Sequence, residues 1–278
     1  MPPRLPVPNR YPALALKALM AAALLLPCAS WAAASVYLED LTTADVSAGL
    51  LAGKTTIIIP VGGTEQNGPH MALGKHNTRA RLLSGRIATA LGDAVVAPVL
   101  PYVPEGNVTP PTEHMRYAGT ISIPDSAFRA VLVGAANSFK QHGFTHIVIL
   151  GDSGNYQTAL KAVADSLNKS WAGSPAKAHF VGEYYAATQT TYVDALKARG
   201  LSAAQIGTHA AVADTSLLMA LSPAMVEPGQ FAEAVRRGKA GGTGGDPRAS
   251  SAELGQLGVD AVVNQAVAAI RLASKAAR

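Results

Sequence analysis

Residues 60–78, PVGGTEQNGPHMALGKHNT, directly follow the apolar, β-branched run TTIII at residues 55–59. The stretch contains one carboxylate (Glu65), three carboxamides, two imidazoles (His70 and His76) and six glycines or prolines. β-Branched residues favour a strand, and the glycines and prolines favour an irregular loop after it. A loop with these donor groups at the end of a central strand is typical of a metal-dependent hydrolase site.

Short β-branched runs alternate with alanine-rich stretches along the rest of the chain. We expect buried strands at residues 55–59, 94–99, 146–150 and 178–181. We expect helices at residues 79–91, 125–142, 156–171, 188–199, 214–220 and 250–277. Strands separated by helices predict an α/β fold of three layers, α/β/α, with a mainly parallel central sheet. Ligands of such folds bind at the carboxyl ends of the strands.

The first 34 residues have the layout of a secretory signal peptide. Three cations without an acid precede an apolar run at residues 18–26, and the small-residue stretch ASWAAA follows. The apolar run is too short for a permanent anchor, which needs ~20 residues. We expect cleavage near Ala32 or Ala34, which leaves residues 35–278 as a single domain in the periplasm or medium, without a membrane anchor.

The N-terminal segment also contains the chain's one cysteine, Cys28. A lipoprotein signal would use this residue, but Pro27 stands before it where such signals have a small residue. Cleavage removes Cys28, so any metal must be held by nitrogen and oxygen ligands. Without the three N-terminal cations the net charge of +5 falls to +2, and nothing indicates nucleic-acid binding.

A second polar loop, GDSGN at residues 151–155, follows the predicted strand THIVIL. Asp152 and Ser153 precede a predicted helix, and such residues commonly cap the free N–H groups of a helix N-terminus. Capping therefore explains this loop as well as ligand binding does.

Residues 60–78 resemble the signature of the creatininase (creatinine amidohydrolase) family, PVGSxEQHGPHLPLGxDT. The resemblance implies a creatininase-like fold and metal-dependent hydrolysis. Asn67 replaces a metal-binding histidine of the family, and His76 replaces its metal-bridging aspartate. The loop at residues 151–155 is similar to the family's NGHGGN or NGHxEN, so Asp152 replaces a second histidine and Gly154 replaces a glutamate ligand.

The resemblance thus implies a metal set of Glu65, His76 and Asp152, in which the family's aspartate and histidine have exchanged places. Two carboxylates and an imidazole suit a divalent Zn, Mn or Fe ion. A neutral imidazole has one free nitrogen and cannot bridge two ions, and Asn67 and Gly154 are weak or absent ligands. We therefore expect one divalent ion rather than two, with complete loss of metal as the alternative.

Three further segments extend the resemblance. They are TEHMRYAGTISI (112–123), THAAVADTS (208–216) and GTGGDPRASSAELG (242–255), which are similar to the family's SxEHxxFPGTISL, DxHAGxxETS and GxxGDPxxAxxExG. The order and spacing of all the segments match from residue 55 to residue 255.

The resemblance assigns catalytic roles to His209 and Asp214. His209 would protonate the leaving nitrogen or hold the developing oxyanion while a metal-bound water attacks. Asp214 would orient His209, although capping of the following helix explains an aspartate there equally well. The residues expected to contact substrate or to support the ligands are Asn67, His70, Glu113, His114 and Asn155. For His70, a solvated loop histidine is the alternative.

The expected function is metal-dependent hydrolysis of a small cyclic amide, a formamide or a lactone through a metal-activated water. Thr208 stands where creatinine-cleaving members have a pocket tryptophan, so creatinine itself is disfavoured, and Trp171 is expected in the core. The alternative function is an inactive, creatininase-fold protein that binds a small molecule. The resemblance also implies a homo-oligomer, and the common state in the family is a hexamer.

Overall fold

The structure is a computed structural model that describes Met1 and residues 35–276. The predicted signal peptide lies outside the described residues, apart from Met1, and stays a prediction. The structure assigns η2 to Leu38–Asp40 and α2 to Thr43–Leu51. These two elements precede the central sheet in the chain.

Four parallel strands form the sheet, in the order β2-β1-β3-β4. Their bounds are β1 Thr56–Val61, β2 Ala94–Val96, β3 His146–Gly151 and β4 Lys177–Phe180. Every residue of β1 is buried, as expected for a central strand covered on both faces. The predicted mainly parallel sheet is confirmed.

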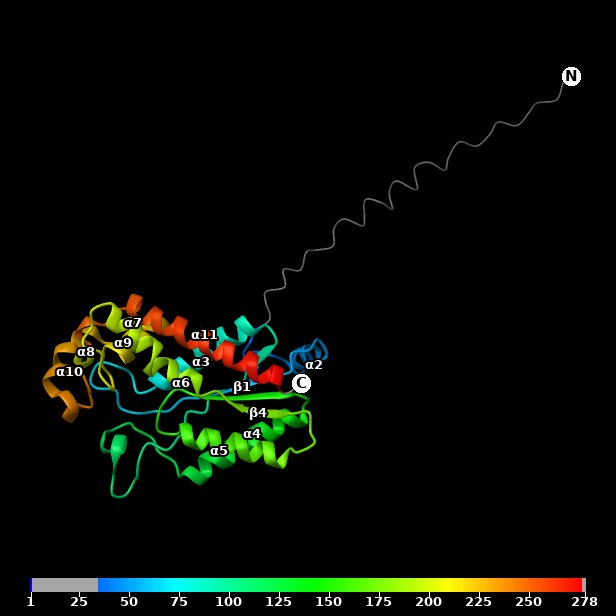
Figure 1. The fold of residues 1–278 in the computed structure, drawn as a ribbon, viewed down its shortest axis with the longest axis horizontal. Coiled ribbons are helices and arrows are strands. Elements are labelled where there is room, and N and C mark those ends of the chain that lie inside the picture. The colour runs from blue at the N-terminus through cyan, green and yellow to red at the C-terminus, as the bar shows by residue number, and fades with distance from the viewer. Residues whose placement is uncertain (2–34, 277–278) are drawn as a thin grey trace. The chain divides into compact units, whose positions relative to one another are not determined.

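Helices cover both faces of the sheet, with α4 and α5 on one face and α3, α6, α9 and α11 on the other (Figure 1). The α-helices are α3 Lys75–Leu91, α4 Asp125–Gln141, α5 Gln157–Ser170, α6 Glu183–Gln189, α7 Thr191–Ala198, α8 Ala203–Ile206, α9 Val212–Leu221, α10 Phe231–Arg237 and α11 Ala252–Ala276. The remaining 3₁₀ turns are η3 Glu113–Arg116, η4 Pro223–Met225, η5 Pro228–Gln230, η6 Gly238–Gly241 and η7 Pro247–Ala249. The three-layer α/β/α fold is thus confirmed.

Alternation along β1 produces a separate apolar core on each face of the sheet. Ile57 and Ile59 pack in the cluster that contains Leu132 of α4, whereas Ile58 packs in the cluster that contains Leu83 of α3 and Val262 of α11. Successive strand side chains point to opposite faces, so one strand anchors both helix layers.

Helix α11 is long and apolar enough to cross a membrane by length and composition alone. Its buried residues, among them Val259, Val262 and Ala266, belong to the core cluster on its face of the sheet. Core packing therefore accounts for its apolar composition.

Helices α2, α8 and α10 were not expected from the sequence, and two expected helices have other bounds. Helix α3 begins at Lys75 rather than at residue 79, because Gly74 is its N-cap and the polar residues that follow are buried in the helix. Residues 188–199, expected as one helix, belong to α6 and α7, which meet at Thr190 with a non-helical φ of −120° and ψ of −89°.

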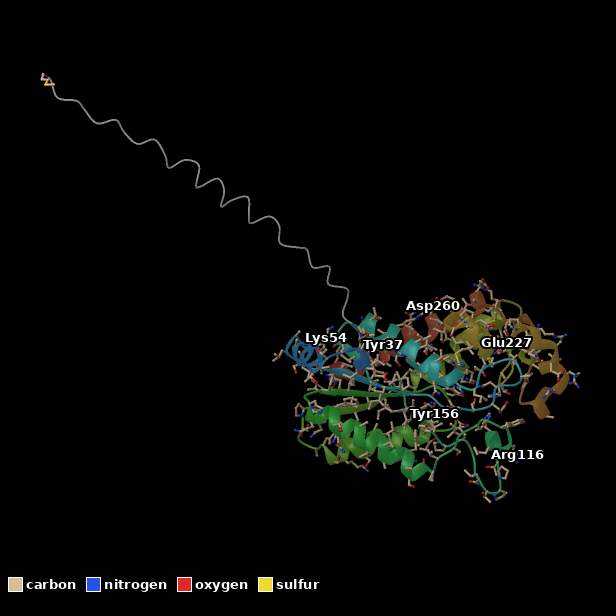
Figure 2. The ribbon with its side chains drawn as sticks, turned by 180° about the vertical axis from the view of Figure 1, so that it is seen from behind. Tyr37, Lys54, Arg116, Tyr156, Glu227 and Asp260 are labelled. Carbon is tan, nitrogen blue, oxygen red and sulfur yellow. The ribbon has the colours of Figure 1, made fainter. Side chains whose placement is uncertain are left out.

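Tyr156 joins the two loops at the carboxyl ends of β1 and β3 (Figure 2). Its hydroxyl group donates to the main-chain oxygen of Gly62 at 2.5 Å and accepts the N–H of Ser153 at 3.0 Å. The N–H of Asp152 also donates to the main-chain oxygen of Val61 at 3.1 Å. These bonds keep the two polar loops side by side.

Candidate metal centre

A cavity of about 590 Å³ lies where the loops after β1 and β3 meet α3, α9 and η3. Its acidic side chains are Glu65, Glu113, Asp152 and Asp214. Its Lys and Arg side chains are Lys75, Arg79, Arg116 and Lys239. Most of these groups come from the segments that the sequence analysis singled out, so the fold brings those segments together in one place.

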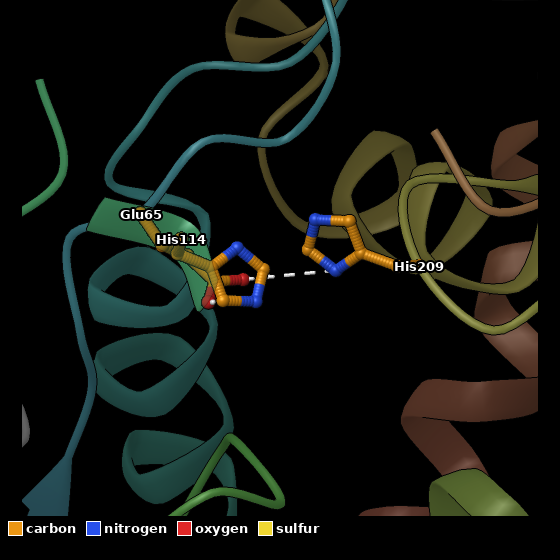
Figure 3. Close-up of side chains that lie close together, drawn as sticks. All are labelled: Glu65, His114 and His209. Atoms are coloured by element: carbon orange, nitrogen blue, oxygen red, sulfur yellow. Dashed lines mark ion pairs between the residues drawn. The ribbon is translucent and has the colours of Figure 1, made fainter. Parts of the chain in front are cut away.

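Glu65, His114 and His209 form a candidate metal site (Figure 3). Nε2 of His114 lies 3.4 Å from Oε2 of Glu65, and Nδ1 of His209 lies 3.8 Å from Oε1 of Glu65. Two ligands about 2.1 Å from one ion, at a tetrahedral angle, are about 3.4 Å apart. One carboxylate and two imidazoles at this spacing fit a single divalent ion.

The hydrogen bonds of His209 determine which of its nitrogens can bind an ion. Nε2 lies 3.0 Å from the main-chain oxygen of Gln66, which can only accept. The ring proton is therefore assigned to Nε2, and the Nδ1 lone pair faces Glu65. Burial, with the charge of Lys75, lowers the pKa of His209 to about 4, so the ring is neutral at pH 7. A neutral ring with a backbone partner is the usual state of a metal-binding histidine.

Gln66 lies between the two imidazoles and was not identified from the sequence. Its Nε2 atom lies 3.2 Å from Nδ1 of His114 and 3.2 Å from Nε2 of His209. Its Oε1 atom accepts the N–H of Gly68 at 3.0 Å, which fixes the orientation of the amide. Because Nε2 of His209 already carries the ring proton, the amide of Gln66 can donate only to Nδ1 of His114, so Gln66 positions the ring of His114. The only sequence signal was its place directly after Glu65 in the family-like motif.

Glu105 is a second buried carboxyl group close to Glu65, and the sequence analysis also missed it. It is 1% exposed, and its Oε2 atom accepts the side-chain N–H of Asn155 at 3.0 Å. Burial, and then the charge of Glu65, raise the pKa of Glu105 to about 7. Asn155, expected to support the site, lines the cavity and holds this carboxyl group.

The structure also brings together the predicted metal set of Glu65, His76 and Asp152. Nε2 of His76 lies 2.9 Å from Oε1 of Glu65, and its Nδ1 lies 2.6 Å from Oδ2 of Asp152. The two carboxylates therefore contact different nitrogens of the His76 ring and lie on opposite sides of that ring. Burial and Lys75 act to lower the pKa of His76, but both carboxylates raise it, and the net direction is upward.

Each ring nitrogen of His76 therefore already faces a carboxylate oxygen. In the described geometry, Glu65, His114 and His209 are the group whose ligand atoms lie close enough together to share an ion. The assignment of His76 and Asp152 as metal ligands stays a prediction.

Lys75 and Arg79, two further cations on the first turns of α3, complete this network. Arg79 contacts Asp152 (Nε to Oδ2, 3.1 Å) and Asp214 (Nη1 to Oδ1, 2.8 Å). Nζ of Lys75 lies 3.4 Å from Oε1 of Glu65 and 3.4 Å from Oδ2 of Asp214. We call the resulting closed ring, in which acids and bases alternate, the charge ring. Its members in order are Glu65, His76, Asp152, Arg79, Asp214 and Lys75.

Neither aspartate of the charge ring acts as a simple helix cap. Helix α5 begins only at Gln157, and Oδ1 of Asp152 accepts the hydroxyl of Tyr184 at 2.8 Å. Asp214 lies inside α9, and its Oδ2 atom accepts the N–H of Ala210 at 3.0 Å. Ala210 has a left-handed φ of 52°, which is unusual for a residue with a side chain. Asp214 therefore holds the backbone that follows His209.

Asn67 and His70 are both fully buried in the loop after β1. The side-chain amide of Asn67 donates to the main-chain oxygens of Glu65 at 2.9 Å and Ala72 at 3.3 Å, so it shapes the loop. Nε2 of His70 lies 3.1 Å from the hydroxyl of Thr215. His70 is therefore not the solvated loop histidine considered as its alternative.

The cavity has aromatic side chains although Thr208 replaces the family's tryptophan. They are those of Tyr117, Tyr185 and Tyr192, which come from elements distant from Thr208 in sequence. Glu113 also lines the cavity, as expected for a substrate contact. Trp171 is 4% exposed, and its Nε1–H donates to Oδ1 of Asn137 at 2.9 Å. Its predicted place in the core is confirmed.

The comparisons with known proteins concern the sequence and the fold. The sequence profile of the creatininase family (creatinine amidohydrolase) matches residues 39–270. A mycofactocin precursor peptide peptidase from Mycolicibacterium smegmatis (strain ATCC 700084 / mc(2)155) is 33% identical over 113 residues, which is 39% of this chain and 43% of the relative. The chain therefore spans less than half the length of this curated relative.

Solved creatininase structures share the fold. One, described as creatininase Mn, has a TM-score of 0.72 at 22% identity and covers 86% of this chain and 98% of that chain. A creatininase point mutant described as the Zn-Zn type has a TM-score of 0.69 at 22% identity, with the same coverage. At this level of identity the likeness shows the fold alone.

Proposed function

Since the chain belongs to the creatininase (creatinine amidohydrolase) family, we propose that it is an amidohydrolase with one divalent ion, Zn, Mn or Fe, held by Glu65, His114 and His209. The observation that carries this proposal is the convergence of one carboxylate and two imidazoles in a polar cavity of about 590 Å³. The substrate classes that fit are a small cyclic amide, a formamide and a lactone, each of which presents a carbonyl group.

A bound divalent ion supplies a water of lowered pKa, ~7, and a Lewis acid for the carbonyl group. The chain supplies the remaining groups. The hydroxyl of Thr243 lines the cavity, is buried, and has no hydrogen-bond partner among the described residues, so it can donate to a substrate oxygen. Glu113 is adjacent to His114 and lines the same cavity. Its carboxylate can take a proton from the attacking water and pass it to the leaving nitrogen.

His209 was expected to supply that proton. Its Nε2–H is bonded to the main-chain oxygen of Gln66, and its Nδ1 lone pair faces Glu65. This arrangement supports a role for His209 as a ligand, so we assign proton transfer to Glu113. Short peptides join the substrate screen because the mycofactocin relatives are named as peptidases. We also propose that the chain is exported to the periplasm or medium and that it forms a homo-oligomer, a hexamer.

A second candidate function is small-molecule binding without catalysis. The observation that favours it is the charge ring, in which each of three carboxylates is paired with two bases of the chain itself. Because these bases already compensate the negative charge of the carboxylates, no metal ion is needed to balance it.

Elemental analysis of the chain purified from the periplasm without chelator tests the proposal, together with a screen of cyclic amides, formamides, lactones and short peptides. We expect one equivalent of metal and hydrolysis of a member of the panel, both lost in Glu65→Gln. The matched control is Glu183→Gln, since Glu183 is exposed on α6. A wild-type chain without stoichiometric metal that still binds a panel compound would support the binding function instead.

A further inference from the structure

Lys75 is the one member of the charge ring that connects the candidate metal site to Asp214. Its side chain is 1% exposed and contributes to the cavity wall. Its ammonium nitrogen lies 3.4 Å from Oε1 of Glu65 and 3.4 Å from Oδ2 of Asp214. A lysine buried to this degree is uncommon and is retained when carboxylates compensate its charge.

A second divalent ion would find ligands in a position that lies next to the first ion and between two carboxylates. A creatininase relative is described as the Zn-Zn type, so the shared fold accommodates two ions in that protein. In this chain the ammonium of Lys75 already lies in such a position. Arg79 likewise compensates Asp152 and Asp214 on the other side of the charge ring.

We propose that Lys75 is a resident cation that takes the place of a second metal ion, so that it limits the site to one ion and binds the substrate's carbonyl oxygen. This inference rests on the proposed function. An ammonium group has three N–H donors; one donates to Oδ2 of Asp214, and Oε1 of Glu65 lies at ion-pair distance, 3.4 Å, as a partner for a second. The third is available to a ligand in the cavity that Lys75 lines.

The chemical step balances without proton loss from Lys75. The water oxygen bonds to the carbonyl carbon, and the carbonyl oxygen becomes an oxyanion that accepts the N–H of Lys75. The C–N bond then breaks, and the leaving nitrogen takes the proton that the water released to Glu113. A preorganised cation at a developing oxyanion is an effective source of transition-state stabilisation.

Titration of the metal-free, full chain with Mn²⁺ alone tests the first half of the inference. We expect one equivalent for wild type, two for Lys75→Met, and one again for Lys75→Met combined with Asp214→Asn, which removes a carboxylate of the new site. Lys161→Met is the matched control, because Lys161 also pairs with an aspartate, Asp165, but is 63% exposed. It should bind one equivalent.

Thermal unfolding with and without Mn²⁺ covers the case in which Lys75→Met folds poorly. If the ammonium replaces an ion, Mn²⁺ should restore the melting temperature of Lys75→Met and raise it by more than it raises that of wild type. A single equivalent in folded Lys75→Met, or a loss of stability that Mn²⁺ does not recover, would overturn the inference. A wild type that binds no Mn²⁺ while Lys75→Met gains one equivalent would overturn the proposed function but uphold Lys75 as the resident cation.

Acetate binding tests the second half of the inference, that Lys75 binds the carbonyl oxygen of the substrate. Acetate is the probe because it is the simplest carboxylate product. In the Mn²⁺-loaded protein, loss of one charge-assisted hydrogen bond should weaken acetate binding about 10- to 100-fold in Lys75→Met combined with Asp214→Asn, which binds one ion, relative to Asp214→Asn alone. Lys161→Met should bind acetate as wild type does. Equal acetate affinity in Asp214→Asn and in the double variant would show that Lys75 does not contact the substrate oxygen.

Discussion

The ammonium nitrogen of Lys75 lies 3.4 Å from Oε1 of Glu65, and the two side chains are 1% and 2% exposed. Burial alone would raise the pKa of the Glu65 carboxyl, but the charges of His76 and Lys75 hold it well below its usual range. Glu65 therefore belongs both to the candidate metal site and to the charge ring. A change at either residue leaves an uncompensated charge on the other.

The two candidate ligand sets predict different metal contents in two variants. His209→Ala should lose the ion, because it removes the lone pair that faces Glu65. Asp152→Asn should retain it, because Asp152 contacts His76, Arg79 and Tyr184 rather than the candidate metal site. Elemental analysis of the purified variants checks both. Metal loss in Asp152→Asn with full retention in His209→Ala would instead establish Glu65, His76 and Asp152 as the ligands.

Opening the charge ring should destabilise the fold. Arg79→Met leaves Asp152 buried with one fewer cation and leaves Asp214 with only Lys75. Removal of one partner from a buried ion pair costs about 3–5 kcal/mol. The exposed pair broken by Lys161→Met should cost at most about 1 kcal/mol. Urea denaturation, followed by circular dichroism, measures both free energies of unfolding, and equal losses would contradict the prediction.

Stability should fall as the pH drops from about 6.5 to about 4, partly because of His70. This residue is fully buried, and burial lowers its pKa from 6.5 to about 4. In this window the unfolded chain binds a proton that the folded chain does not, so stability decreases as the pH falls. The full shift corresponds to about 3 kcal/mol.

His70→Gln keeps a polar partner for Thr215 and removes this titration. Urea denaturation between pH 4 and pH 7 should show a weaker pH dependence in the variant than in wild type. Other groups, such as His179 with a pKa lowered to about 4, contribute equally to both proteins and cancel in the comparison. The same slope in both would show that His70 does not titrate in this range.

Metal removal should lower the melting temperature of wild type. A free ion concentration of 100 times the dissociation constant stabilises the folded state by about 2.7 kcal/mol. Differential scanning calorimetry with and without EDTA measures the effect. Glu65→Gln should show no response to EDTA, since it has lost a ligand, and a response equal to that of wild type would place the ion elsewhere.

The fold was predictable because its signals are local. The β-branched runs and alanine-rich stretches marked all four strands and most helices within a few residues. The beginning of α3 was missed because Lys75 and His76 are polar and do not continue an apolar helical period. Their burial depends on Glu65, Asp152 and Asp214, which come from three other segments, and no local pattern contains that information.

The sequence by itself determined the three-layer α/β fold, the family, and the loops that converge at the carboxyl ends of the strands, because hydrophobic periodicity and motif spacing act over short distances. Only the tertiary structure decided which groups pair within that convergence. His76 contacts two carboxylates at once, whereas His114 and His209 face Glu65 in the candidate metal site. Electrostatic pairing depends on distances of a few ångströms between side chains distant in sequence, and these distances exist only in the folded chain.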